Sequence, residues 1–178
     1  MTSLAPHLLR HIIGVAVTIF CFSSAHAQTL TSAGYGDIKF GDSLAAAEMA
    51  LGESVDPLAS ALKPACDYVR FKKYPGIMFM VNGSTIKRAD VRTPAIVKNE
   101  ANIRVGTSVS AVVQRFLEKH DFLKLEISPH KYDEQGHYLA LVNIKNKSAL
   151  QFGVHNGKIT GEIQAGLDPE VYLVEGCS

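Results

Sequence analysis

The chain has 178 residues, with 18 Lys and Arg against 17 Asp and Glu, a formal net charge of +1 and no Trp. This length suits one compact domain, or two small units that share a core. The nearly balanced charge argues against a nucleic-acid or polyanion binder, so we expect no nucleic-acid partner.

The first 27 residues have the pattern of a secretory signal peptide. They contain no Asp or Glu, carry Arg10 near the start and continue into an apolar run at 12–22. Ala25-His26-Ala27 follows, with the small residues that signal peptidases accept, so we expect cleavage after Ala27. The sequence therefore predicts a periplasmic or secreted protein of the bacterial cell envelope.

Two other fates of this segment are disfavoured. The apolar run has 11 residues, whereas a membrane-spanning helix needs about 20, so no membrane anchor is expected after cleavage. Lipid attachment at Cys21 is disfavoured because the bulky Phe20 precedes it, inside the apolar run.

Cleavage would change the charge and cysteine counts. Without Arg10 the chain keeps 17 basic and 17 acidic residues, and without Cys21 it keeps Cys66 and Cys177. An even pair in an oxidising compartment favours a disulfide, which would close a loop of about 110 residues and stabilise the fold by roughly 4–5 kcal/mol at most. Two free thiols or a metal site are the alternatives, but there is no CxxC and no nearby His.

The mature chain begins with a linker and a short helix in this interpretation. Residues 28–36 are small and polar, as in a linker. Asp42 or Ser43 can cap a helix over 44–51, and Gly52 suits its left-handed end. Leu44, Ala47 and Leu51 fall on one face of that helix.

A similar pattern returns 65 residues later, which indicates an internal repeat. Residues 103–108 match 38–43 at several positions, and a second helix is predicted over 109–117. Its apolar stripe consists of Val109, Val112, Val113 and Phe116.

Strand-like segments follow each helix, with Asn82-Gly83 and Asn156-Gly157 as hairpin turn signals. The predicted strands are 66–73, 76–82 and 85–93 in the first half, and 125–132, 138–145, 149–155, 158–165 and 171–174 in the second. Their alternation of apolar and polar residues is typical of antiparallel sheets with one buried and one solvated face.

The expected fold is therefore α+β. It consists of two tandem repeats of a short helix plus an antiparallel sheet, with the helices on one face and one disulfide closing the structure. The expected boundaries are a signal peptide at 1–27, a linker at 28–36, a first repeat at 37–98 and a second at 99–178. The other face of the sheets would be an open platform.

The two openings, Ile38-Lys39-Phe40-Gly41-Asp42-Ser43 and Ile103-Arg104-Val105-Gly106-Thr107-Ser108, each precede a helix and an Asn-Gly hairpin. This duplicated pattern resembles the SmpA/OmlA-type envelope modules and the tandem modules of β-lactamase inhibitory proteins. The segments around Cys66 and Cys177 resemble small exported proteins of proteobacteria. The family's frequent Glu after the capping Ser is absent, since Ala46 and Ala111 stand there. Only one disulfide is possible, and no inhibitor contact residue is transferable.

The densest chemistry lies in residues 130–138. His130 and His137 flank a predicted turn, and with His155 and Asp133 or Glu134 they offer a possible zinc ligand set. The His-x6-His spacing matches no standard zinc motif, so surface histidines on a polar hairpin are the preferred interpretation. There is no G-x-S-x-G elbow. We predict no catalytic residue, no metal and no cofactor.

The leading functional hypothesis is a non-catalytic binding protein for a protein or peptide ligand in the envelope, acting as an inhibitor or an assembly accessory. Tyr and Arg are frequent interface anchors, and exposed Met makes soft apolar contacts. The candidate binding residues are Tyr68, Arg70, Met78, Met80, Arg88, His130, Tyr132, His137, Tyr138 and His155. Burial of Met78 and Met80 under a helix or loop is the alternative for that pair.

Two other functions stay open from the sequence. A carbohydrate or cell-wall binding module would use Tyr132, Tyr138, Asn143 and Gln151, although the lack of Trp counts against it. A metal-dependent enzyme would use His130, His137 and His155.

Overall fold

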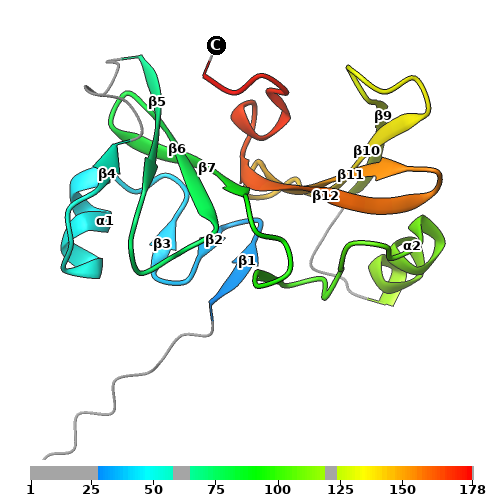
Figure 1. Cartoon of the computed structure of the whole chain (residues 1–178), viewed down its shortest axis with the longest axis horizontal. Coiled ribbons are helices and arrows are strands. Elements are labelled where there is room, and N and C mark those ends of the chain that lie inside the picture. The colour runs from blue at the N-terminus through cyan, green and yellow to red at the C-terminus, as the bar shows by residue number, and fades with distance from the viewer. Residues whose placement is uncertain (1–27, 58–64, 119–123, 178) are drawn as a thin grey trace, which may run out of the picture.

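The computed structural model describes residues 28–57, 65–118 and 124–177. These residues form a mainly β structure with two sheets and two α-helices. The strands of the large sheet run in the order β4-β5-β6-β7-β12-β11-β10-β9, and those of the small sheet in the order β3-β2-β1-β8 (Figure 1). The predicted signal peptide, residues 1–27, lies outside the described part of the chain.

The elements follow one another along the chain with these bounds: β1 Thr29–Thr31, β2 Gly34–Tyr35, β3 Ile38–Lys39, α1 Leu44–Leu51, β4 Asp56–Pro57, β5 Cys66–Arg70, β6 Ile77–Asn82, β7 Thr85–Val91, β8 Lys98–Asn99, α2 Val109–Glu118, β9 Lys124–Pro129, β10 Gly136–Asn143, β11 Ser148–His155, β12 Lys158–Leu167 and the 3-10 helix η1 Glu170–Tyr172.

The expected α+β fold of two helix-plus-sheet repeats is wrong. Strands make up 46% of the structure and helices only 14%. The strands after α1 and those after α2 do not form separate sheets, because β7 pairs with β12 through Arg88–Gly166, Ala89–Ala165 and Asp90–Gln164. Four strands from each half, β4–β7 and β9–β12, belong to one antiparallel sheet, and a second sheet, from β1, β2, β3 and β8, lies outside the expected scheme.

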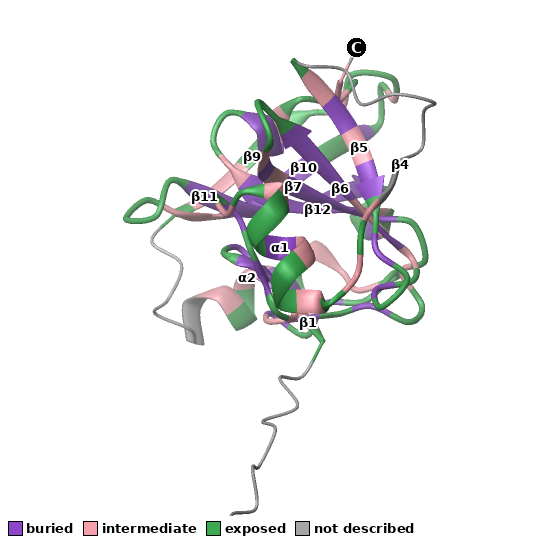
Figure 2. Ribbon diagram, turned by 90° about the vertical axis from the view of Figure 1, so that its left-hand side faces the viewer, coloured by how far each residue is buried: buried purple, intermediate pink, exposed green. Residues whose placement is uncertain are grey.

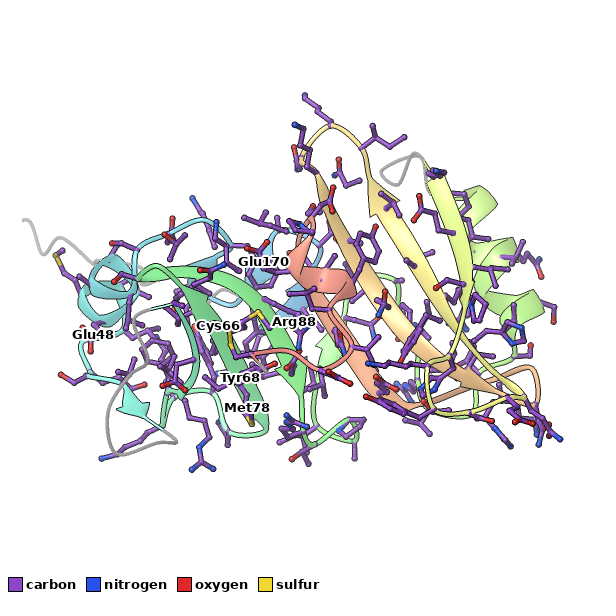
Figure 3. All side chains as sticks on the ribbon, turned by 90° about the horizontal axis from the view of Figure 1, so that it is seen from above. Glu48, Cys66, Tyr68, Met78, Arg88 and Glu170 are labelled. Atoms are coloured by element: carbon purple, nitrogen blue, oxygen red, sulfur yellow. A yellow bond between two sulfur atoms is a disulfide. The ribbon has the colours of Figure 1, made fainter. Side chains whose placement is uncertain are left out.

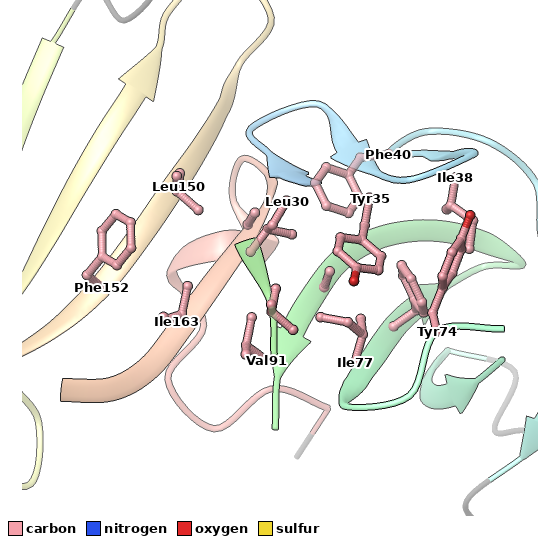
Figure 4. Packing of buried hydrophobic residues seen from close by; sticks show 14 of the residues in the cluster. Leu30, Tyr35, Ile38, Phe40, Tyr74, Ile77, Val91, Leu150, Phe152 and Ile163 are labelled. Carbon is pink, nitrogen blue, oxygen red and sulfur yellow. The ribbon is translucent and has the colours of Figure 1, made fainter. Parts of the chain in front are cut away.

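The segment expected as a linker, 28–36, contributes to this second sheet. β1 pairs with β2 and, in parallel, with β8, which lies almost seventy residues away. Leu30 and Tyr35 are buried, and the Tyr35 ring meets the Tyr74 ring edge to face at 5.0 Å. Figure 4 shows Leu30, Tyr35 and Phe40 beside residues of the large sheet. The small sheet thus closes the apolar core.

Both helices begin where the sequence predicted. The Ser43 hydroxyl accepts a hydrogen bond from the backbone N–H of Ala46 at 3.1 Å, and Gly52 ends α1 with φ at +67°. The Ser108 hydroxyl accepts from the N–H of Ala111 at the start of α2. Ala47 and Val112 are the buried anchors of the two helices. Among the described residues, neither helix is long and apolar enough to cross a membrane.

The core lies on one face of the large sheet. Figures 1 and 2 show α1, α2 and the small sheet on that side, with buried strands above them. Its larger members are Phe71, Tyr74, Phe79, Leu139, Leu150, Phe152 and Ile163. Phe71 and Phe79 stack edge to face at 5.6 Å. Leu150, Phe152 and Ile163 lie in this core, as the alternation in β11 and β12 predicted. The solvated second face is wrong for β11, because Gln151 and Gly153 are buried as well.

The C-terminal segment differs from its prediction. The expected strand at 171–174 is instead η1, whose Val171 is buried against Ala140 and Ala149. This contact lies on the face of the sheet opposite the helices. The disulfide Cys66–Cys177 is confirmed, with the two Cα atoms 5.3 Å apart, and it fixes the end of the chain to β5 (Figure 3).

Candidate functional site

The face of the large sheet that points away from the helices carries a polar row. Strand register aligns Asp90 of β7, Gln164 of β12 and Gln151 of β11 side by side. All three are buried polar residues. We call this side the outer face and these three residues the polar row.

The outer face is not the open platform that the sequence predicted. Residues 173–177, the C-terminal strap, run across it after η1 (Figure 3). At one end Cys177 is bonded to Cys66. Glu175 accepts from Lys131 and from the Tyr132 hydroxyl, both beside the β9–β10 turn. The strap therefore connects the two halves of the large sheet.

The buried Arg88 side chain binds the first residue of the strap, Leu173. Its guanidinium is only 2% exposed and donates to the backbone oxygens of Glu170, at 2.9 Å, and Leu173, at 2.6 Å. The same group pairs with Asp90, with Nε 2.7 Å from the carboxylate, and donates to the Tyr68 hydroxyl at 2.6 Å. Burial, and then the Asp90 charge, raises the pKa of Tyr68 to about 12. Arg88 is thus a structural clamp.

Gly176 lets the strap pass close over this clamp. It has φ at +64°, and a Cβ there would lie 2.0 Å from the Tyr68 hydroxyl oxygen. We expect Gly176→Ala to lower the free energy of unfolding by more than the roughly 1 kcal/mol that a left-handed site alone costs. Denaturant unfolding measures this.

Gly157→Ala is the matched control for that substitution. Gly157 has φ at +69° but no heavy atom within 4 Å of an added Cβ. The loss of unfolding free energy in Gly157→Ala therefore measures backbone strain alone. Equal losses for the two variants would show that the close approach to Tyr68 contributes nothing.

A polar groove of about 440 Å³ lies beside the strap, where β7 meets β12. Its lining residues are Tyr68, Arg88, Asp90, Val91, Arg92, Gly161, Glu162, Ile163, Gln164, Val174 and Glu175. Gln164 is only 7% exposed, and its side-chain oxygen has no hydrogen-bond partner among the described residues. An unpartnered buried acceptor is costly, which makes this groove the candidate site.

A histidine–tyrosine stack lies next to the groove, because His130 pairs with Glu162 of its lining. The rings of His130 and Tyr138 lie 4.5 Å apart and nearly parallel. His130 Nδ1 accepts from the N–H of Tyr132 at 3.2 Å, so Nε2 carries the proton toward the Glu162 carboxylate at 3.0 Å. Burial, and then the Glu162 charge, raises the pKa of Tyr138 to about 12.

His155 makes a separate pair with Asp133, with Nδ1 2.5 Å from the carboxylate. This hydrogen bond holds the pKa of Asp133 below its ordinary value of 3.8. A depressed carboxyl pKa stabilises the folded state above the unfolded pKa and loses that effect as the pH falls through the folded pKa.

We expect His155→Ala to raise the pKa of Asp133 toward 3.8, because the main cause of the depression is removed. A carboxyl ¹³C NMR titration measures it. His137→Ala, at an exposed position of the adjacent strand, is the control and should leave Asp133 unchanged. An unaltered Asp133 titration in His155→Ala would contradict the pairing.

The structure brings only some of the predicted binding residues together. Tyr68 and Arg88 line the groove, with His130, Tyr132 and Tyr138 beside it, but Met80, Arg88 and Tyr138 are buried. Met78 is half-buried, and its sulfur accepts from Arg92 at 3.1 Å. Arg70 is exposed on β5 and is not among the groove residues.

The three histidines do not converge on a metal site. His137 and Tyr138 are neighbours on β10, so their side chains point to opposite faces. The His130 ring stacks on Tyr138, which places His137 on the other face. His130 and His155 each pair with a different carboxylate. Within the described ranges, no three His, Cys, Asp or Glu side chains are grouped as metal ligands.

The residues suggested for sugar binding are also dispersed. Gln151 and Tyr138 are buried, and Asn143 lies at the opposite end of β10 from Tyr138. Only Tyr132, 67% exposed, offers an open ring.

Among the acidic and amide residues of the groove, the sequence prediction missed all four, Asp90, Glu162, Gln164 and Glu175. The alternation of β12 does place Glu162 and Gln164 opposite the buried Ile163. That signal identifies the face, but it does not reveal that β7 would supply Asp90 beside Gln164.

The chain matches no protein-family model, no curated protein and no solved structure.

Proposed function

We propose that this protein is a non-catalytic binding protein of the cell envelope, and that a protein or peptide segment seats in the groove between the strap and β12. The observation that carries the proposal is the Gln164 side-chain oxygen, buried under the groove without a hydrogen-bond donor. The signal-peptide pattern of residues 1–27 and the disulfide support an exported location.

The chemistry of the groove suits a peptide. The Gln164 oxygen and the Glu162 carboxylate are acceptors, and peptide N–H groups are donors. The terminal torsion of a Gln side chain is broad, so the amide can turn toward a ligand at small cost. Exposed Arg92 adds a donor on the rim for a backbone carbonyl or a carboxylate.

The strap gives this groove a fixed shape. The disulfide, the Arg88 contacts and Glu175 attach it at three places. A preformed wall lowers the entropic cost of binding, which favours recognition by shape. The charged groups of the strap and clamp are engaged in these contacts, which supports a binding role over a catalytic one.

A displayed random peptide library, selected on the oxidised full-length protein, tests the proposal. We expect selected peptides to lose at least tenfold in affinity, about 1.4 kcal/mol, with Gln164→Leu, because the leucine offers no acceptor. Glu162→Gln should weaken peptides that carry Lys or Arg. Lys158→Gln, exposed at the far end of the same strand, is the matched control.

Each variant is first compared with the wild type by circular dichroism and thermal unfolding, so that a lost fold is not mistaken for a lost contact. Selected peptides that bind Gln164→Leu as tightly as the wild type would place the ligand elsewhere. A library that yields no binder would contradict peptide recognition.

A further inference from the structure

A second and larger cleft, of about 960 Å³, is lined by residues of the segment 94–105, by Thr29 of β1 and by Gly161 of β12. β7 pairs with β12 only over Arg88–Asp90, and beyond this point the chain leaves the sheet in the segment 94–105. We call the space beside that segment the loop cleft. Its lining includes Ile96, Val97, Lys98, Ile103, Arg104 and Val105.

Apolar residues make up half of the lining of the loop cleft, beside polar and basic ones. Ile96 is 60% exposed and Val105 is 54% exposed, although both are large apolar side chains. Val97 and Ile103, which also line it, are buried in the core. Two exposed aliphatic side chains on one concave surface are a feature of ligand sites more than of plain surface.

Every charged residue that lines the loop cleft is basic. Lys98 and Arg104 are both exposed there. Arg115 of α2 adds a third positive charge nearby, because its guanidinium donates to the backbone oxygen of Asn102 at 2.6 Å. The neighbouring acid, Glu100, is directed to the backbone N–H of Ser32 at 2.8 Å and does not line the cleft.

We propose that the loop cleft binds a single-chain anionic amphiphile of the fatty-acid type. The apolar chain lies against Ile96 and Val105, and the carboxylate lies at Lys98 and Arg104. A cleft of this volume falls within the usual range for small-molecule sites, roughly 300–1,000 Å³. Apolar lining residues beside a rim of one charge sign match a ligand that has one apolar and one anionic end.

This site is distinct from the peptide groove, although Gly161 lines both. Its contacts with the ligand do not involve Gln164, the strap or the disulfide. The two proposals can therefore fail separately.

Isothermal titration calorimetry with dodecanoate, kept below its micelle concentration, tests the assignment on the oxidised full-length protein. We expect dodecanoate to bind at least tenfold tighter than neutral dodecyl maltoside. Inorganic phosphate alone should not bind, because it has no apolar chain. Dodecyl phosphate binding tighter than dodecanoate would overturn the carboxylate assignment.

Two variants probe the two ends of the ligand. Val105→Asp should abolish dodecanoate binding, because it places a carboxylate among the apolar lining residues. The double variant Lys98→Glu/Arg104→Glu should remove the preference over dodecyl maltoside. Lys72→Glu, an exposed lysine that is not among the cleft residues, is the charge control and should behave as the wild type.

All three altered positions are exposed, and thermal unfolding verifies that each variant folds. If Val105→Asp does not fold, Val105→Ser, which removes the apolar contact at smaller cost, takes its place. Equal affinity for the neutral amphiphile, or unchanged binding in the double variant, would overturn the proposal. Dodecanoate binding that is lost with Gln164→Leu would also overturn it, since the ligand would then occupy the groove.

Discussion

Arg88→Met is expected to lower the free energy of unfolding by about 3–5 kcal/mol, because it leaves a buried carboxylate without its partner. The Arg88 and Asp90 side chains are only 2% and 9% exposed, and the ion pair between them is 2.7 Å long. Methionine fills much of the same volume, so the loss reports charge and hydrogen bonding more than a cavity.

The same substitution also removes the donor for the strap. The backbone oxygens of Glu170 and Leu173 and the Tyr68 hydroxyl all receive a hydrogen bond from Arg88. Buried acceptors left without a donor cost about 1–3 kcal/mol each when water cannot reach them. Burial, and then the Asp90 charge, raises the pKa of Tyr68, and the Arg88 charge opposes that rise.

Urea unfolding at neutral pH measures the effect. Arg92→Met is the control, because Arg92 is exposed and its hydrogen bond is to the Met78 sulfur, so a change within about 0.5 kcal/mol is expected. The double variant Arg88→Met/Asp90→Val should recover part of the loss, since no buried charge remains. A loss under about 1 kcal/mol for Arg88→Met would show that water reaches Asp90.

Removal of the disulfide should have an effect of similar size. Cys66 and Cys177 are 111 residues apart in the sequence, so the bond restricts the unfolded chain strongly. For the double variant Cys66→Ser/Cys177→Ser we expect a loss of about 2–5 kcal/mol. Reduction of the wild-type protein should give the same value, which separates loss of the crosslink from any effect of the serines.

Amide hydrogen exchange shows which part of the protein loses stability when the disulfide is removed. Without the bond, Arg88 and Glu175 still attach the strap through the hydrogen bonds seen in the described part of the chain. The N–H of Gly176, bonded to the Leu173 oxygen, should then exchange before those of β11 and β12. Unchanged protection at Gly176 in the double variant would show that Arg88 alone fixes the strap.

The losses of unfolding free energy from Arg88→Met and from removal of the disulfide are expected to be coupled. Arg88 and the disulfide hold the same five-residue segment, so the combined variant should lose less than the sum of the separate losses. Simple additivity would indicate that the two ends of the strap are independent.

The local features of this protein were determined by its sequence. Ser43 and Gly52 bound α1 because their side-chain and backbone preferences act within one helical turn. The Asn156-Gly157 turn has both residues at positive φ, as a tight hairpin requires. Leu150 and Phe152 face the core because alternation depends only on strand geometry. The disulfide followed from an even pair of cysteines.

Tertiary structure alone decided which segments meet. Alternation assigns a face to each strand but not a neighbour, so nothing local shows that β7 pairs with β12 and merges the expected repeats into one sheet. Leu30 and Tyr35 are buried because the distant β8 pairs with β1. Arg88, which the sequence analysis proposed as a binding residue, is instead buried, because the strap covers it and Asp90 lies beside it. Such contacts join residues that are far apart in the chain. The pattern of apolar and polar residues within one segment therefore cannot predict them.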